Sequence, residues 1–578
     1  MLKQIKYISL IAVLISAASF AQERTKDTLD SEVVNVVKPY TPTVADAFKI
    51  KETPVLDDDV NTTKKEIKYN IFSIPVASTF TPAKGKAATV NKAKPIKLYD
   101  NYASLGVGTY TTILGEVYLN HELGRGENVG GYFTHHSSSG GIDGVLLDDD
   151  FIDTKLHVNY SQRLRDLSWT LEGGGLYQKY NWYGLPKPYF DATTADTLDV
   201  GHQFYGGNVG AKIKLYDYLI KDASVRYRRF GDNQGSGENR FVLKGTADVP
   251  IQDELISTEL TIDYINGSFS RNFYTDSKIN YGNVSFGIAP SYQLTQDDLT
   301  LNLGVNLVYK NNTGDFGASK LHIYPNITAS FRIIDELMIA FGGLEGGLKQ
   351  NSYYDLAQEN PFVSPTLYIS PTDQKYNLSV GLKGKLSNSI SYSVGGYYMN
   401  ENDKALYTSN PVFVEATEDY QYGNSFGIVH DDVKTFSFVG ELNVDVNRNF
   451  KLGAKTEYFS YSSNSEAEAW NLPDLKASLF MDYQIDENWF AGAGLLYVGE
   501  RKDQFLQYSY IQDITSIQET VTLDSYFDAN AHVGYRFDDQ LSFYAKANNI
   551  ADKTYQRWIN TPVQGIQFLV GATYQFDF

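Results

Sequence analysis

The last fourteen residues of the chain, GIQFLVGATYQFDF, alternate between apolar and polar side chains. Because successive side chains of a β-strand point to opposite faces, this segment has one apolar face and one polar face. An unprotected edge strand of this kind is an aggregation hazard in water. The alternation therefore predicts a transmembrane strand whose apolar face meets lipid and whose edges are both paired. The apolar set is Ile566, Phe568, Val570, Ala572, Tyr574, Phe576 and Phe578, and Leu569 is the exception on the polar face.

The same alternation recurs from residue 98 onward, for example in the runs 151–161, 321–333 and 521–537. These runs have 11 to 17 residues, which is longer than the ~5–6 of ordinary strands and suits a tilted crossing of a bilayer. The predicted lipid-facing sets are Ile152, Thr154, Leu156, Val158 and Tyr160; then Leu321, Ile323, Ile327, Ala329, Phe331 and Ile333; and then Leu523, Phe527, Ala529, Ala531, Val533, Tyr535 and Phe537.

Short links rich in Asp, Asn or Gly separate the runs. We count ten, near Arg125, Arg165, Tyr218, Asp253, Asp297, Asp335, Ser387, Arg448, Asp486 and Asp538. An outer-membrane barrel has short periplasmic turns, long outer loops and both chain ends in the periplasm. Ten periplasmic turns then predict an all-β fold, an antiparallel transmembrane barrel of about 22 strands over residues 98–578. The longer segments 177–205, 349–376, 399–434 and 499–523 are expected to be outer loops.

Bulk composition agrees with a barrel once the alternation is known. Mean hydropathy is −0.32, and no stretch beyond the N-terminus has the ~18 consecutive apolar residues of a spanning helix. In a transmembrane barrel only every second residue faces lipid, so the mean hydropathy of the chain does not reveal the membrane-spanning strands. The chain's 44 Tyr and 32 Phe fit aromatic girdles at the membrane interfaces. They would also fit a β-sandwich or a propeller, which the length of the runs disfavours.

The N-terminus has the pattern of a secretory signal peptide. Lys3 and Lys6 precede an apolar stretch over residues 8–18, and small residues lead to a cleavage position after Ala21. Residues 1–21 are therefore expected to be removed on export to the outer membrane. The chain has no Cys, which excludes disulfides and a lipid-modified Cys. Its net charge of −19 argues against nucleic acid as a partner.

Catalytic and metal-binding patterns do not stand out. The acidic clusters at 55–60 and 145–150 lack the Gly and the terminal Glu of an EF-hand loop. The eight His are scattered, and the adjacent His135 and His136 would point to opposite faces of a strand. No nucleophile motif or phosphate-binding loop is found. We therefore expect no enzyme activity, no cofactor and no metal site.

The C-terminal stretch 545–578 resembles the end of TonB-dependent outer-membrane receptors. The resemblance rests on Asn548, Asn549, Asp552, Lys553, Tyr555, Pro562, Gly565 and Phe578. It implies an outer-membrane barrel that takes part in the uptake of a bulky solute. It also implies that Tyr574, Phe576 and Phe578 form the signal read by barrel-assembly machinery, so the expected partners are that machinery and outer-membrane lipid.

Residues 22–97 depart from that family, because they are too few for its folded plug domain. Six of the chain's 17 Pro lie there, and residues 84–97 hold five Lys and no acid, which is typical of an irregular periplasmic arm. Glu32, Val33, Val34, Asn35, Val36 and Val37 look like a TonB box, a short extended strand offered to TonB by β-augmentation. The same segment would equally suit another periplasmic or outer-membrane protein, or no partner. Residues 67–82 are a hypothetical reduced plug.

Two functions remain open at this point. The first is a TonB-dependent-receptor-like transporter that captures a bulky solute with its Tyr- and Asn-rich outer loops. The second is a receptor-derived barrel that serves as a structural or assembly subunit of an outer-membrane complex through residues 22–97.

Overall fold

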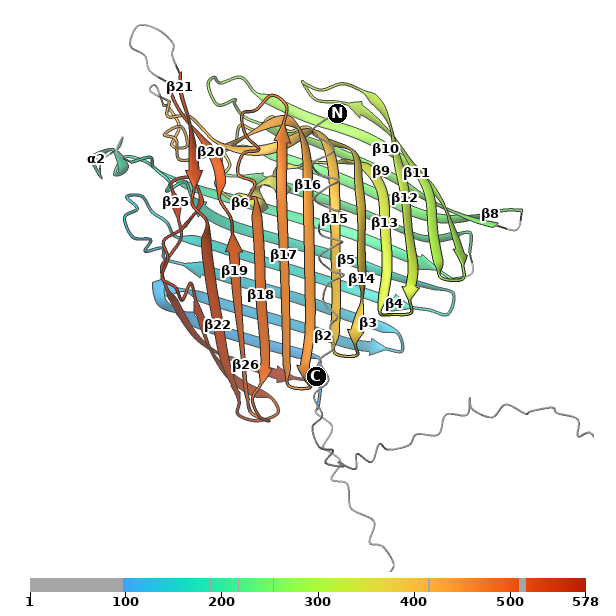
Figure 1. Ribbon diagram of the computed structural model, residues 1–578. Helices are drawn as coiled ribbons and strands as arrows, with labels where there is room; N and C mark the ends of the chain where they lie inside the picture. Colours follow the sequence, from blue (N-terminus) through green and yellow to red (C-terminus); the bar gives the residue numbers. More distant parts are fainter. Residues whose placement is uncertain are drawn as a thin grey trace, which may run out of the picture. The chain divides into compact units, whose positions relative to one another are not determined.

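The computed structural model describes residues 97–578 apart from 188, 189, 191, 217, 253, 414, 415 and 509–515 (Figure 1). The predicted signal peptide, the TonB-box-like segment and the hypothetical reduced plug lie outside the described residues. Within the described part of the chain, no helix has the length and apolarity needed to cross a membrane.

Twenty-two strands form one sheet. They are β1 (Asn101–Gly108), β2 (Ile113–Gly124), β3 (Glu127–Ser138), β4 (Phe151–Arg163), β5 (Leu167–Asn181), β6 (Gly201–Leu215), β7 (Ile220–Asp232), β8 (Gly237–Ile251), β9 (Glu254–Phe269), β10 (Ile279–Gln296), β11 (Leu299–Asn312), β12 (Lys320–Ile334), β13 (Met338–Lys349), β14 (Thr372–Ser387), β15 (Ile390–Ser409), β16 (Phe426–Asn447), β17 (Phe450–Ser463), β18 (Leu475–Gln484), β19 (Trp489–Val498), β22 (Tyr526–Arg536), β23 (Leu541–Asn548) and β26 (Gln567–Phe576).

Short elements occupy the connections. Two hairpins form separate sheets, β20 (Arg501–Tyr508) with β21 (Ser516–Leu523), and β24 (Gln556–Trp558) with β25 (Thr561–Pro562). The helical pieces are η2 (Thr109–Thr111), α2 (Ala192–Ala195) and α3 (Tyr353–Glu359).

The sheet closes into a barrel because its first and last strands pair. β1 runs antiparallel to β26, from Asn101 opposite Phe576 to Gly108 opposite Leu569. Every other strand pairs antiparallel with its neighbours around the ring. The predicted 22-stranded antiparallel barrel is therefore confirmed.

All ten predicted turns connect neighbouring strands of the barrel. Their Asp residues have a physical role. Asp297 and Asp335 adopt the left-handed backbone conformation that Asp tolerates in tight turns. The Asp486 carboxylate accepts the backbone N–H of Asn488 (2.8 Å) and Trp489 (2.7 Å), and Asp538 repeats the pattern in its own turn. The opposite end of the barrel carries the longest connections, as expected of its outer side.

The two strand faces differ as predicted in most runs. In β12, Leu321, Ile323 and Phe331 are exposed on the outer wall, whereas His322 and Tyr324 are buried on the lumen side. The run 521–537 was predicted wrongly as one strand. β21 ends at Leu523 and β22 begins at Tyr526, and Leu523 is buried in the outer loops instead of facing lipid. Alternation along one strand continued by chance into the next, so the pattern could not reveal the break.

The closing seam between β1 and β26 is supported on its lumen face and at its end. On the lumen side the Tyr544 ring lies across Gly571 and Gly106, where a Cβ would come within 2.5 Å and 2.7 Å of Tyr544 atoms. Only glycine, which lacks a Cβ, allows the Tyr544 ring to approach the backbone this closely. At the end of the seam, Asp577 accepts the backbone N–H of Asp100 (3.0 Å) and pairs with Lys97 (3.3 Å).

Candidate functional site

The connection between β13 and β14, residues 350–371, folds inward and is called the lumen segment here. Its helix α3 begins because Ser352 caps it, accepting the backbone N–H of Asp355 (3.1 Å). The helix buries Tyr353, Leu356 and Ala357. A loop of this length with so many buried residues is a packed element and not a surface excursion.

The lumen segment reaches opposite walls of the barrel. Gln358 exchanges two side-chain hydrogen bonds with Gln178 of β5 (2.6 and 3.3 Å). Val363 forms a β-bridge with Phe426 of β16. Since β5 and β16 lie eleven strands apart in a ring of 22, they face each other across the lumen. The segment therefore crosses the outer mouth of the barrel.

Two buried carboxylates of the wall bind Tyr353. Its hydroxyl donates to Asp232 (2.6 Å), which also contacts His202 Nε2 (3.3 Å). Its backbone N–H donates to Glu238 (2.6 Å), which also accepts from the Tyr281 hydroxyl (2.8 Å). All of these side chains are fully or almost fully buried. We call this set the Tyr353 latch.

Ion pairs and aromatic rings surround the Tyr353 latch. Arg228 approaches Glu238 (3.3 Å) and Asp355 (3.6 Å), and its guanidinium lies 3.9 Å from the centre of the Tyr354 ring. Arg240 joins Asp355 (3.3 Å) to Asp263 (2.7 Å). Three rings of the wall pack edge-on against Tyr353, with centroids 5.0–6.0 Å away: Phe204, Phe230 and Phe269. The helix is thus fixed by charge and by shape.

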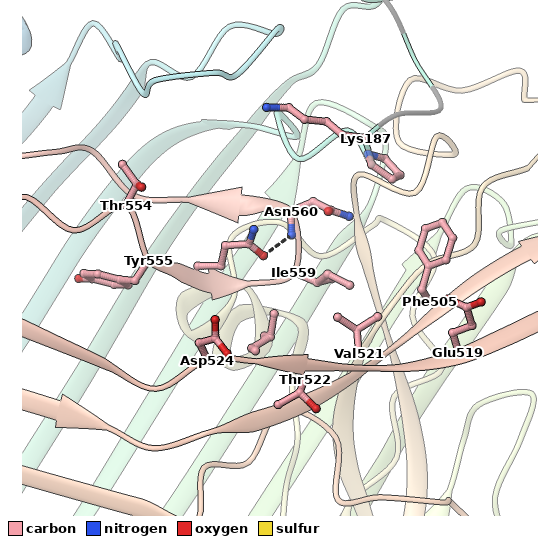
Figure 2. A pocket seen from close by; sticks show the side chains of 13 residues that line it. Lys187, Phe505, Glu519, Val521, Thr522, Asp524, Thr554, Tyr555, Ile559 and Asn560 are labelled. Carbon is pink, nitrogen blue, oxygen red and sulfur yellow. Dashed lines mark hydrogen bonds between the residues drawn. The ribbon is translucent and has the colours of Figure 1, made fainter.

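A cavity of about 500 Å³, called the outer pocket here, lies between the two hairpins of the outer loops (Figure 2). This volume is in the range of small-molecule sites. Its polar lining carries two carboxylates, one Lys, two amides and hydroxyl groups, whereas its floor is apolar. The lining residues are Pro186, Lys187, Phe505, Glu519, Val521, Thr522, Leu523, Asp524, Thr554, Tyr555, Gln556, Ile559 and Asn560.

The wall of the outer pocket at Tyr555 is rigidly supported. The Tyr555 ring stacks on Tyr526, with centroids 3.9 Å apart, and its hydroxyl donates to Asp528 (3.0 Å). Arg501 of β20 donates to the carbonyl oxygens of Gln556 (2.8 Å) and Arg557. These contacts tie one hairpin to the other and fix the orientation of the Tyr555 ring.

The β20–β21 hairpin is attached to the barrel through a buried carboxylate. Asp503 accepts the backbone N–H groups of Ser409, at the end of β15 (3.1 Å), and of Gln504 (2.8 Å). Burial raises the pKa of Asp503 to about 7, although these hydrogen bonds act in the opposite direction.

The outer pocket and the lumen segment share one apolar core. Leu523 and Ile559 from the pocket floor belong to the same buried cluster as Tyr353 and Val363. Trp558 connects them, since its ring contacts Phe426 (5.6 Å between centroids) beside the Val363 bridge. The floor of the outer pocket and the lumen segment are therefore packed into one core.

The structure places some of the predicted site residues and not others. The TonB-box-like residues 32–37 lie outside the described residues. Tyr574, Phe576 and Phe578 form a row at the closing seam, with Tyr574 and Phe578 exposed and successive rings 5.8 and 5.5 Å apart. Their role as an assembly signal stays a prediction. No group of three or more His, Asp or Glu that could hold a metal ion occurs in the part of the chain that the structure describes.

Sequence reasoning missed the Tyr353 latch. The only local signal was the Ser352–Asp355 spacing of a helix cap inside the predicted outer loop 349–376. The wall residues of the latch look like ordinary lumen positions of their strands.

Comparisons with known proteins agree with this architecture. The family model described as "TonB dependent receptor-like, beta-barrel" matches residues 99–550. The comparison with curated proteins gave no match. Among solved structures, the pyoverdine outer membrane receptor FpvA from Pseudomonas aeruginosa PAO1 aligns with a TM-score of 0.61 at 12% identity, over 84% of this chain and 80% of that chain.

Two further structures have the same fold. The ferric-catecholate import receptor Fiu from E. coli K12 gives a TM-score of 0.59 at 10% identity, over 83% of this chain and 82% of that one. The siderophore receptor PiuA from Acinetobacter baumannii gives 0.58 at 12% identity, with 83% and 82% covered. The family match covers most of the chain, and the chain therefore belongs to the TonB dependent receptor-like β-barrel family of bacterial outer-membrane receptors.

Proposed function

We propose that the protein takes up a bulky solute across the outer membrane and captures it in the outer pocket. The observation that carries this proposal is the shared core: the pocket floor and the lumen segment pack together at the outer mouth of a receptor-family barrel. The proposed site of solute capture therefore lies next to the segment that crosses the path of the solute. Membership of a receptor family supports uptake in place of catalysis.

The pocket lining favours a hydroxyl-rich, uncharged part of the solute, such as a sugar residue. Gln556, Asn560 and Thr522 offer both donors and acceptors, and Asp524 adds a strong acceptor for hydroxyl groups. The Tyr555 ring and the apolar floor suit the C–H face of such a residue. With two carboxylates against Lys187, the lining disfavours a polyanion.

The proposed energy coupling uses residues 32–37. Val33, Val34, Val36 and Val37 favour an extended strand that TonB could pair with through backbone hydrogen bonds. Tagged purification from native membranes tests this point. TonB should copurify with the wild type and be lost when residues 33–37 are replaced by a Pro-containing sequence. Recovery of other envelope proteins in constant ratio without TonB would instead support the structural-subunit function. A barrel whose outer mouth is crossed by the lumen segment is also compatible with that function.

Uptake itself is tested on spent growth medium. Strains with and without the gene are grown on a complex medium, and the remaining solutes are compared by mass spectrometry. We expect at least one bulky solute to stay in the medium of the deletion strain and to be consumed again after complementation. The variant Tyr555→Ala should restore consumption poorly, whereas Tyr218→Ala, an exposed Tyr in a turn at the other end of the barrel, should restore it fully. Identical media from both strains would refute uptake.

A further inference from the structure

We infer that the lumen segment is an outer gate: it closes the mouth of this barrel and swings out as one unit when the path opens. A barrel of 22 strands encloses a wide lumen that must be filled to prevent leakage. Here the chain's own β13–β14 connection crosses the mouth from the β5 wall to the β16 wall. Closure by the segment requires no solute, whereas opening for a solute rests on the proposed function.

The base of the lumen segment is built as a hinge. The Asn351 side chain donates to the carbonyl oxygen of Ser370 (2.7 Å) and lies 3.1 Å from the Thr372 hydroxyl. The two ends of the segment are therefore clamped side by side where it leaves the strands. A loop whose two ends are joined in this way can move as one piece.

The polar contacts that hold the segment closed are suited to release. The Tyr353 latch consists of hydrogen bonds to the carboxylates of Asp232 and Glu238. These groups would be costly to leave unpaired in a dry interior, but water satisfies them as soon as the segment moves. The segment also buries Leu356 and Val363 in the shared apolar core, so opening must separate part of that core as well.

The buried core shared by the outer pocket and the lumen segment would connect occupation of the pocket to opening of the gate. Tyr407 of β15 donates to the carbonyl oxygen of Leu356 and approaches Glu359 (both 3.1 Å), and its ring contacts Trp558 (5.1 Å). Trp558 follows the pocket residue Gln556 on β24. Displacement of the pocket floor is thereby transmitted to the C-terminal half of α3.

The first test measures conductance and needs no solute. The full-length protein and a variant with residues 352–369 replaced by a short Gly-Ser linker are inserted into planar bilayers. Heat-dependent migration on denaturing gels verifies that the barrel is intact. We expect at least a tenfold increase in ionic conductance for the shortened variant, and increased sensitivity to vancomycin in cells that express it. An intact shortened barrel that conducts no more than the wild type would overturn the inference.

A second variant keeps the test decisive if the shortened chain does not fold. Tyr353→Phe removes the bond to Asp232 and keeps the ring, so brief openings should become several-fold more frequent. Tyr227→Phe, whose hydroxyl donates to Asn239 away from the segment (2.7 Å), is the matched control and should leave the openings unchanged. Equal opening frequencies for the two variants would count against the gate.

Cross-linking separates a gate from a static plug. Because the chain lacks Cys, the pair Gln178→Cys and Gln358→Cys can be joined by a bismaleimide without background. The control pair Glu127→Cys and Gln162→Cys lies within the wall, where these side chains are also hydrogen-bonded (2.9 Å). Consumption of the solute found in the spent-medium experiment should stop in the first pair only. Continued consumption with the segment cross-linked would refute the gate while leaving uptake itself intact.

Discussion

The outer and inner parts of the lumen are built on the same strands but differ in what covers their side chains. Along β7, successive lumen-facing side chains become steadily more buried toward the outer end. The Arg226 side chain is 57% exposed, Arg228 17%, and Phe230 and Asp232 not at all. β8 repeats the trend, from Lys244 at 54% to a fully buried Glu238.

The lumen segment, and not the strand pattern, therefore decides the role of a polar lumen residue. In the inner part Glu172 pairs with Lys212 (3.1 Å) and Arg226, and both cations remain half exposed to solvent. In the outer part Glu238 and Asp232 have the same chemistry, but their partners include backbone and side-chain groups of the segment. Identical residue types are thus solvated wall groups at one end and buried anchors at the other.

Removal of the outer anchor should have the largest effect. In Glu238→Ala, Arg228 and the Tyr281 hydroxyl lose a buried partner, which costs about 3–5 kcal/mol. Hydrogen exchange of the amides in residues 350–371 should accelerate by at least about a hundredfold, since local opening becomes easier. Glu238→Gln keeps one carbonyl acceptor and should lie between this variant and the wild type. Unchanged protection in Glu238→Ala would place the anchor elsewhere.

Asp503 should make the attachment of the outer hairpin pH-dependent. Its pKa is raised to about 7 in the folded protein, so the folded state holds a proton that the unfolded state releases near pH 4. The stabilisation is fully present below about pH 4 and is lost as the pH rises to about 7, by up to about 1.4 kcal/mol per pKa unit. The protection factors of the amides in the described part of the β20–β21 hairpin, which correct for the intrinsic pH dependence of exchange, should therefore be lower at pH 8 than at pH 5.

The variant Asp503→Asn is the control for this titration, because its side chain keeps the acceptor for Ser409 and cannot ionise. The hairpin amides of this variant should have the same protection factors at pH 5 and at pH 8. If the wild-type protection factors are also equal at the two pH values, the buried carboxylate does not titrate in this range.

The inner part of the lumen should tolerate the matching substitution. Arg226→Ala removes an ion pair with Glu172 that lies in contact with solvent, and such pairs contribute about 0–1 kcal/mol. We expect an unchanged thermal unfolding temperature to within about 2 °C and unchanged amide exchange in the lumen segment. A loss comparable with that of Glu238→Ala would abolish the distinction between the two parts of the lumen.

The barrel was predictable because its signals are local. Alternation reports the two faces of a strand, and the Asp-rich turns report where strands end, as Asp486 and Asp538 show. Ten turns were enough to count the strands. The prediction was wrong at Leu523, because alternation does not indicate which sheet a strand joins.

The candidate site was not predictable because its contacts are distant in the sequence. Tyr353 binds Glu238 and Asp232, which precede it by more than a hundred residues. The outer pocket likewise brings Lys187 together with Tyr555. The sequence marked residues 349–376 as a long loop, but only the closed ring of strands determines that this loop points inward. The TonB-box-like segment remains a prediction.

The pairing of β1 with β26 also has a consequence for the order of events during assembly. Asn101 and Phe576 are separated by 475 residues, and closing a flexible loop of that length costs roughly 5 kcal/mol of chain entropy. Long-range pairing of this kind is slow. Both edges of the sheet therefore stay unpaired until these two strands meet, and their pairing is the step that completes the barrel.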